Sequence, residues 1–81
     1  MELIYEETLS DSGCKEAAVE LWATGVPPQE KIMTPYLIAW EQVDADGEFK
    51  CGFSALEGHT KFEAIRAAIE LLNSIKAEIG L

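Results

Sequence analysis

Apolar residues recur with helical spacing near the end of the chain. Between Gly58 and Leu81, at about 100° per residue, one arc collects Phe62, Ile65, Ala68, Ile69, Leu72, Ile75 and Ile79. Thr60 and Glu63 have the Thr-x-x-Glu spacing of a capping box, and Gly80 suits a helix end. The pattern predicts one amphipathic helix that buries one face.

Alternating apolar and polar positions precede this helix and are typical of β-strands. Residues 36–43 and 49–56 flank the turn-forming segment 44–48, in which Gly47 can adopt a positive φ, so we expect a β-hairpin. In its second arm Lys50, Gly52 and Ser54 alternate with an apolar row made of Phe49, Cys51, Phe53 and Ala55.

The first part of the chain predicts a second hairpin. Residues 2–9 read as a strand that ends at the turn-forming segment 10–13. The next segment, 16–23, is ambiguous, because its Ala, Glu and Leu content favours a helix whereas its alternation favours a strand. We interpret it as a strand. Residues 24–35 contain one glycine and three prolines and are expected to form a loop.

These elements predict an α+β fold, with an antiparallel, four-stranded sheet of two hairpins and the C-terminal helix packed on one face. Its length of 81 residues suits a single domain, 1–81. The first seven residues lack a basic start and a long apolar run, which argues against a secretory signal or a membrane anchor. A cytoplasmic location is the expectation.

Short motifs add a resemblance. Gly25-Val26-Pro27, then Trp40, then Gly58-His59-Thr60 leading into Glu63-Ala64-Ile65 occur in this order, and the chain resembles, over nearly its whole length, a family of small bacterial domains of unknown function. The segment 58–65 is also similar to the strand-to-helix junction of HicB-like antitoxins, which usually carry Asp where His59 stands. The resemblance implies the sheet-plus-helix layout and no particular activity.

The net charge of −9 is unevenly distributed along the chain. Residues 1–30 hold seven acidic residues and the single base Lys15, whereas residues 58–81 hold three of each sign. The acidic charge therefore belongs to the expected sheet. This argues against direct binding to nucleic acid and to anionic membranes, both of which attract clusters of Lys and Arg.

Candidate catalytic groups are few. His59 is the only histidine, and no sequence signature pairs a serine or cysteine with it. A small enzyme that uses His59 with Glu57 or Cys51 is a hypothesis that we do not favour, so we expect no enzyme. Cys14 and Cys51 lack the Cys-x-x-Cys spacing of zinc or redox sites, and we expect two reduced thiols, with a single disulfide as the open alternative.

Metal and cofactor sites have no support in the sequence. Asp44, Asp46 and Glu48 crowd one turn, but a calcium loop needs more widely spaced oxygen ligands, and a solvated turn is the expected structure. The glycines do not form a phosphate-binding loop. We expect no metal and no cofactor.

One sheet face is the most suggestive feature. If the apolar rows of the strands meet the helix, the opposite face collects Ile4, Trp22, Leu37 and Val43 among Glu2, Glu6, Glu16, Glu20 and Glu41. A single helix leaves that face uncovered and available to a partner. The residues predicted to bind a partner are Glu6, Glu16, Glu20, Trp22 and Glu41, whereas Trp40, in register with Tyr36 and Ile38, is expected in the core.

Two functional hypotheses follow from this face. The first is a small, acidic, non-enzymatic protein-binding module whose partner is basic, for example an immunity, antitoxin or anti-defence inhibitor. The second is a structural or self-assembling domain that forms a homodimer through the same face or through a sheet edge, with its acidity serving solubility. A solvated face without any role is a further alternative.

Overall fold

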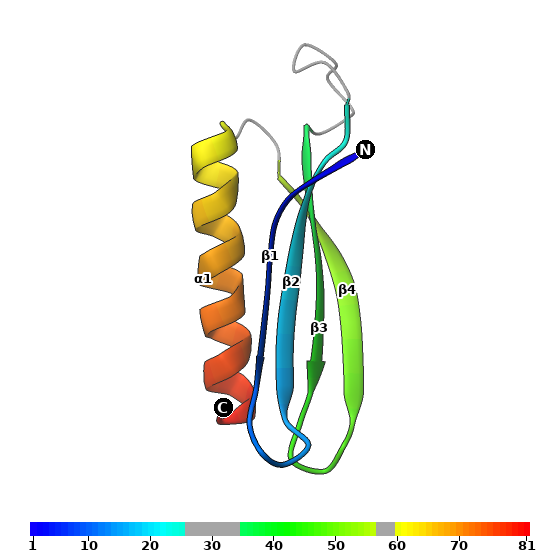
Figure 1. Ribbon diagram of the computed structural model, residues 1–81, viewed down its shortest axis with the longest axis vertical. Coiled ribbons are helices and arrows are strands. Elements are labelled where there is room, and N and C mark those ends of the chain that lie inside the picture. The colour runs from blue at the N-terminus through cyan, green and yellow to red at the C-terminus, as the bar shows by residue number, and fades with distance from the viewer. Residues whose placement is uncertain (26–34, 57–59) are drawn as a thin grey trace.

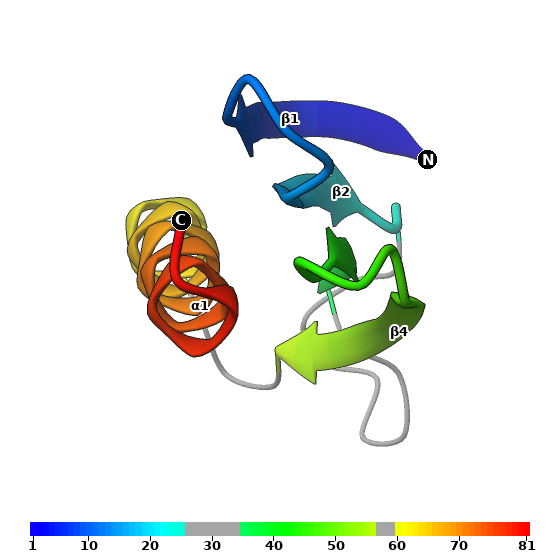
Figure 2. The same cartoon turned by 90° about the horizontal axis from the view of Figure 1, so that it is seen from below.

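The computed structural model describes residues 1–25, 35–56 and 60–81. The elements are β1 (Glu2–Ser10), β2 (Glu16–Ala23), β3 (Tyr36–Val43), β4 (Phe49–Leu56) and α1 (Lys61–Ile79). The strands form one antiparallel sheet in the order β1-β2-β3-β4. Helix α1 runs along one face, and no described residue forms a second layer on the other (Figures 1 and 2). The predicted α+β fold is confirmed.

Helix α1 begins and ends where the sequence predicts. The Thr60 hydroxyl accepts from the Glu63 N–H at 3.2 Å, and the Glu63 carboxylate accepts from the Thr60 N–H at 3.0 Å, which completes the capping box. Gly80 ends the helix at φ 74°, a conformation that costs glycine little. The Lys15 ammonium donates to the Gly80 carbonyl at 3.1 Å and so ties the helix end to the sheet.

The buried face of α1 is narrower than the predicted arc. The helix packs mainly on β2 and β3 and reaches β1, and its buried residues are Ala64, Ala68, Leu72, Ile75 and Ile79. Phe62 and Ile69 were expected on this face, but they are 71% and 40% exposed. Each lies roughly 100° or more around the helix from Ala68, outside the set of residues that pack on the sheet.

Segment 16–23 is a central strand, as interpreted. Ala17, Val19 and Leu21 are almost completely buried between α1 and the neighbouring strands. Burying each large apolar side chain contributes about 1.5–3 kcal/mol, whereas the helix propensities of ordinary residues differ by no more than ~0.7 kcal/mol each. Burial therefore outweighs local preference in β2.

The turn after β3 is held by its own carboxylate. Asp44 Oδ1 accepts from the N–H groups of Asp46 and Glu48 at 2.9 and 3.0 Å, and Gly47 has φ 80°. The Cys14 thiol, in the turn between β1 and β2, donates to the carbonyls of Asp44 and Ala45. The two turns at this end of the sheet are therefore joined.

The apolar row of β4 faces away from the helix, which corrects the assumption that all such rows meet α1. Val43 pairs with Phe49 and Ala39 with Phe53, so these side chains share the outer face of the sheet. On the helix side Trp40 lies against Gly52, where an added Cβ would stand 2.7 Å from Trp40 Cζ2. The sequence predicts Trp40 in the core, whereas the structure places it half-buried and packed against the core from the side.

Strand β1 departs from the expected alternation near its start. Its register with β2 shifts between Leu3 and Tyr5, and Ile4 packs against the core instead of lying on the outer face. Leu3, which pairs with Trp22, takes that place. Glu2 also leaves the predicted face, because its partner Ala23 follows Trp22 and points to the helix side.

Candidate protein-binding surface

The face of the sheet opposite α1, called the open face below, is defined by the strand register. Residues directly opposite one another on antiparallel strands point to the same side. By this rule the open face comprises Leu3, Glu6, Thr8, Ser10, Glu16, Ala18, Glu20, Trp22, Leu37, Ala39, Glu41, Val43, Phe49, Cys51, Phe53 and Ala55. All five residues predicted to bind a partner lie on it.

Three carboxylate side chains extend from neighbouring strands in the middle of the open face. Glu6 on β1 stands directly opposite Glu20 on β2, which places their Cβ atoms about 4.5–5.5 Å apart. Glu41 on β3 lies one pleat along, opposite Ala18. This set is called the carboxylate cluster below. The pairing of like charges across β1 and β2 opposes folding, because such pairs destabilise a sheet.

Trp22 and Glu16 flank the carboxylate cluster on β2. Trp22 is half-buried, and its Nε1–H donates to the Glu20 carboxylate at 3.4 Å, so the indole helps to orient that side chain. Glu16 pairs with Ser10 and Val43 at the far end of the strand. The residues predicted from the sequence therefore form a band along β2 rather than one compact site.

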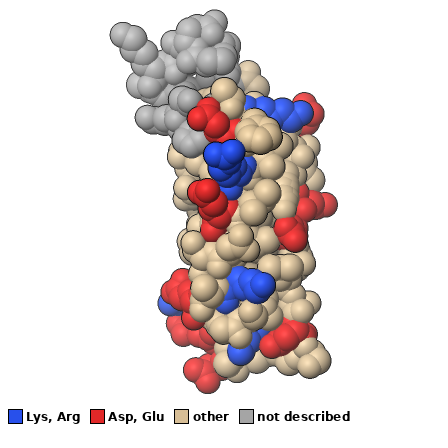
Figure 3. All heavy atoms as spheres, turned by 90° about the vertical axis from the view of Figure 1, so that its left-hand side faces the viewer, with Lys and Arg blue, Asp and Glu red and all other residues tan. Residues whose placement is uncertain are grey.

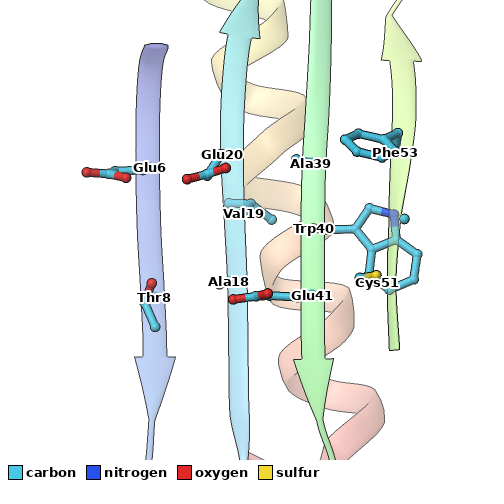
Figure 4. A pocket seen from close by; sticks show the side chains of 11 residues that line it. Glu6, Thr8, Ala18, Val19, Glu20, Ala39, Trp40, Glu41, Cys51 and Phe53 are labelled. Atoms are coloured by element: carbon cyan, nitrogen blue, oxygen red, sulfur yellow. The ribbon is translucent and has the colours of Figure 1, made fainter. Parts of the chain in front are cut away.

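A hollow of about 310 Å³ lies beside the carboxylate cluster. Its lining includes Ala18 and Ala39, whose small side chains leave room between larger neighbours. Figure 4 shows the Phe53 ring reaching from β4 towards Ala39, with the three carboxylates on the other side of the view. The hollow thus has an acidic side and an aromatic side.

The aromatic side is not predicted by the pattern of apolar and polar residues. Phe53 and Phe49 are 75% and 56% exposed, and Cys51 is exposed between them. The missing signal was the hairpin register, because a short turn that pairs Val43 with Phe49 puts both on one face. The sequence places Val43 on the outer face, and the pairing of Val43 with Phe49 places Phe49 there too.

Charges on the other side of the molecule are mixed. On the face that carries α1, Lys and Arg side chains are interspersed with Asp and Glu (Figure 3). Arg66 also lies over the ring of Phe62, with 5.5 Å between Cζ and the ring centroid. The carboxylate cluster lies on the opposite side, so the two faces of the sheet differ in chemistry.

The pKa of Tyr5 on β1 is perturbed by its surroundings. The Tyr5 hydroxyl donates a hydrogen bond to the Glu7 carboxylate. This bond, together with burial and the nearby negative charge, raises the pKa of Tyr5 above the ordinary value of 10.0. Tyr5 pairs with Leu21 and therefore faces the helix, so this group is not part of the open face.

Other candidate chemistry is limited to isolated groups. Cys14 and Cys51 are free and exposed, one in a turn and the other at the hollow. Within residues 1–25, 35–56 and 60–81, no three His, Cys, Asp or Glu side chains are grouped to hold a metal ion. His59 and Glu57, named with Cys51 in the enzyme hypothesis, and the Val26-Pro27 motif lie outside the described residues.

No helix in the described part of the chain has the length and apolar character needed to span a membrane. No protein-family model, curated protein or solved structure matches this sequence.

Proposed function

We propose that this chain is a non-enzymatic protein-binding module that uses its open face to bind a basic partner. The observation that carries the proposal is the hollow that Glu6, Glu20 and Glu41 line together with the exposed ring of Phe53. No described residue covers this side of the sheet. The resemblance to small bacterial domains of unknown function remains a prediction beside it.

The chemistry of the hollow favours a partner that presents Arg or Lys next to apolar groups. A guanidinium group can pair with a carboxylate and stack on an aromatic ring at the same time. The net charge of −9 would also steer a basic protein towards this chain. An immunity, antitoxin or anti-defence inhibitor that covers a basic cleft, such as that of a nuclease, is the specific form we propose.

A homodimer through the open face is the second candidate, favoured by the exposure of Phe49 and Phe53. Stacking two copies face to face would bring two carboxylate clusters against each other, and Glu16 with them. Like charges placed together at an interface cost several kcal/mol. A basic partner therefore fits the open face better than a second copy does.

Selection of random peptides displayed on phage against the folded protein tests the proposal. We expect the enriched peptides to combine Arg or Lys with aliphatic or aromatic residues. The synthesised peptides should then lose most of their affinity for the triple variant Glu6→Gln, Glu20→Gln and Glu41→Gln, and bind more weakly at high salt.

The matched control changes the net charge equally but away from the open face, with the substitutions Glu48→Gln, Glu70→Gln and Glu78→Gln. This control should keep the affinity for the selected peptides. Enrichment of acidic or uncharged peptides that bind the open-face variant as tightly as the original protein would contradict the proposal.

A further inference from the structure

The two free edges of the sheet differ in their readiness to accept another strand. Strand β1 carries the register shift between Leu3 and Tyr5 and the acidic residues Glu2, Glu6 and Glu7, all features that discourage pairing at an edge. Strand β4 pairs with β3 without a shift over eight residues, and Lys50 is its only charged residue. A long, regular and apolar edge strand is a template for a further strand.

The outward hydrogen-bonding groups of β4 can be identified from two bonds. The Asp44 N–H donates to the Glu48 carbonyl at 3.1 Å, so Asp44 and Glu48 form a hydrogen-bonded pair. Such pairs alternate along an antiparallel ladder. The Thr24 N–H, which follows β2, donates to the Pro35 carbonyl before β3 at 2.9 Å. This bond shows which residues of β3 point their hydrogen-bonding groups towards β2, and it agrees with the alternation deduced from Asp44 and Glu48. The N–H and C=O groups of Phe49, Cys51, Phe53 and Ala55 therefore point outward, and none of the described strands pairs with them.

We propose that the β4 edge binds the β4 edge of a second copy of this chain. Antiparallel pairing about a two-fold axis makes each edge its own complement. Only registers that oppose outward-pointing residues can form hydrogen bonds. The register with most bonds places the axis at Gly52, with Cys51 opposite Phe53 and Phe49 opposite Ala55 of the second copy. The product is one continuous eight-stranded sheet.

The charge distribution selects this edge for a second copy. Glu6 lies three strand spacings, roughly 14 Å, from β4. The two Glu41 side chains would also be separated by three spacings, roughly 14 Å or more, which exceeds the screening length of about 8 Å at physiological salt. A copy with a net charge of −9 can therefore approach β4 with much less repulsion than it meets on the open face.

The side chains around the two-fold axis at Gly52 allow the two β4 edges to approach each other closely. Gly52 has no side chain, and the Trp40 indole covers it on the helix side. On the open face, Phe53 would lie beside Cys51 of the second copy, and both hollows would stay accessible on one extended surface. Dimerisation through β4 does not depend on the proposed function, because the strand edge and the open face are different surfaces.

Molecular mass measured by light scattering and by sedimentation over a range of concentrations gives the first test. We expect a dimer that dissociates on dilution. Cys51→Pro removes an outward N–H from each copy, which should weaken dimerisation about tenfold or more. The bond with β3 is spared, since proline is tolerated at an outward position of an edge strand. Cys51→Ser keeps the N–H and should remain a dimer.

Several results would overturn the proposal. They are a monomer at every concentration, a folded Cys51→Pro protein that still forms the dimer, or a Cys51→Ser protein that does not. The last result would show that the interface depends on the thiol side chain rather than on the backbone edge.

Amide hydrogen exchange of the unmodified protein keeps the inference testable if Cys51→Pro does not fold. The amides of Phe49, Cys51, Phe53 and Ala55 should exchange rapidly at low concentration and become protected at high concentration. The amides of β1 should not change. Protection of β4 that is absent at high concentration, or that appears on β1 instead, would overturn the inference. The proposed peptide binding at the open face is tested separately, with the Glu→Gln variants.

Discussion

At the scale of single residues, the contact between Trp40 and Gly52 explains the unusual orientation of β4. Trp40 is too large to lie on the helix side beside a neighbour with a side chain, because an added Cβ at Gly52 would reach 2.7 Å from Cζ2 and 3.0 Å from Cε2. Gly52 does not have a positive φ, so glycine is needed here because it has no side chain and not because of its backbone freedom. The indole then covers the part of β4 that α1 leaves uncovered.

Gly52→Ala should therefore destabilise the fold, although alanine normally suits a strand better than glycine. Overpacking of this kind costs about 1–3 kcal/mol in the free energy of unfolding, which denaturant titration would measure. Gly13→Ala in an exposed turn is the control, because a Cβ added there would lie 3.4 Å from its nearest neighbour, Asp11 Oδ1. Its effect on the free energy of unfolding should stay within about 0.5 kcal/mol. Equal losses in the two variants would contradict the role given to Trp40.

At the scale of elements, the pairing of β1 with β2 places two carboxylates opposite each other, although like charges at such positions lower the stability of a sheet. Glu6 and Glu20 face each other across the two strands, and Trp22 holds Glu20 from the same strand. The fold tolerates this repulsion, which is consistent with a surface that a positive partner neutralises. The carboxylates that make one side of the hollow acidic are therefore the same ones that lower the stability of the fold.

Glu6→Lys should stabilise the fold, because it converts a like-charged cross-strand pair into an opposite-charged one. The expected gain is about 0.2–1 kcal/mol, measured as the free energy of unfolding at low salt. Glu2→Lys makes the same change of charge on the same strand opposite Ala23 and should gain less. An equal gain in the Glu2 variant would show that only the net charge matters, and a larger one would contradict a repulsion specific to Glu6 and Glu20.

The sequence predicted elements better than it predicted their faces. The capping residues and the period of 3.6 identified α1 because these signals are local, and the alternation of Ala17, Val19 and Leu21 identified β2. The orientation of β4 depends on its register with β3, which the hairpin turn sets and an apolar row alone does not. The open face was thus predicted with its carboxylates but without Phe49 and Phe53.

At the scale of the whole molecule, acidic charge is concentrated in the sheet. Residues 58–81 are balanced, and the face that carries α1 shows both signs (Figure 3). The excess of carboxylates on β1 to β3 repels itself in the folded state, where the strands hold the side chains closer together than an unfolded chain does. A basic partner or added salt should relieve the same repulsion.

Sodium chloride should therefore raise the melting temperature of the protein. Screening of the sheet carboxylates between low salt and molar salt is expected to contribute on the order of 1 kcal/mol, which corresponds to about 4–8 °C for a domain of this size. The variant with Glu6→Gln, Glu20→Gln and Glu41→Gln should melt higher at low salt and gain less from added salt. Chloride is preferred to sulfate, because sulfate stabilises folded proteins by exclusion from their surface. An unchanged melting temperature, or an equal gain in the triple variant, would show that these carboxylates do not repel one another in the fold.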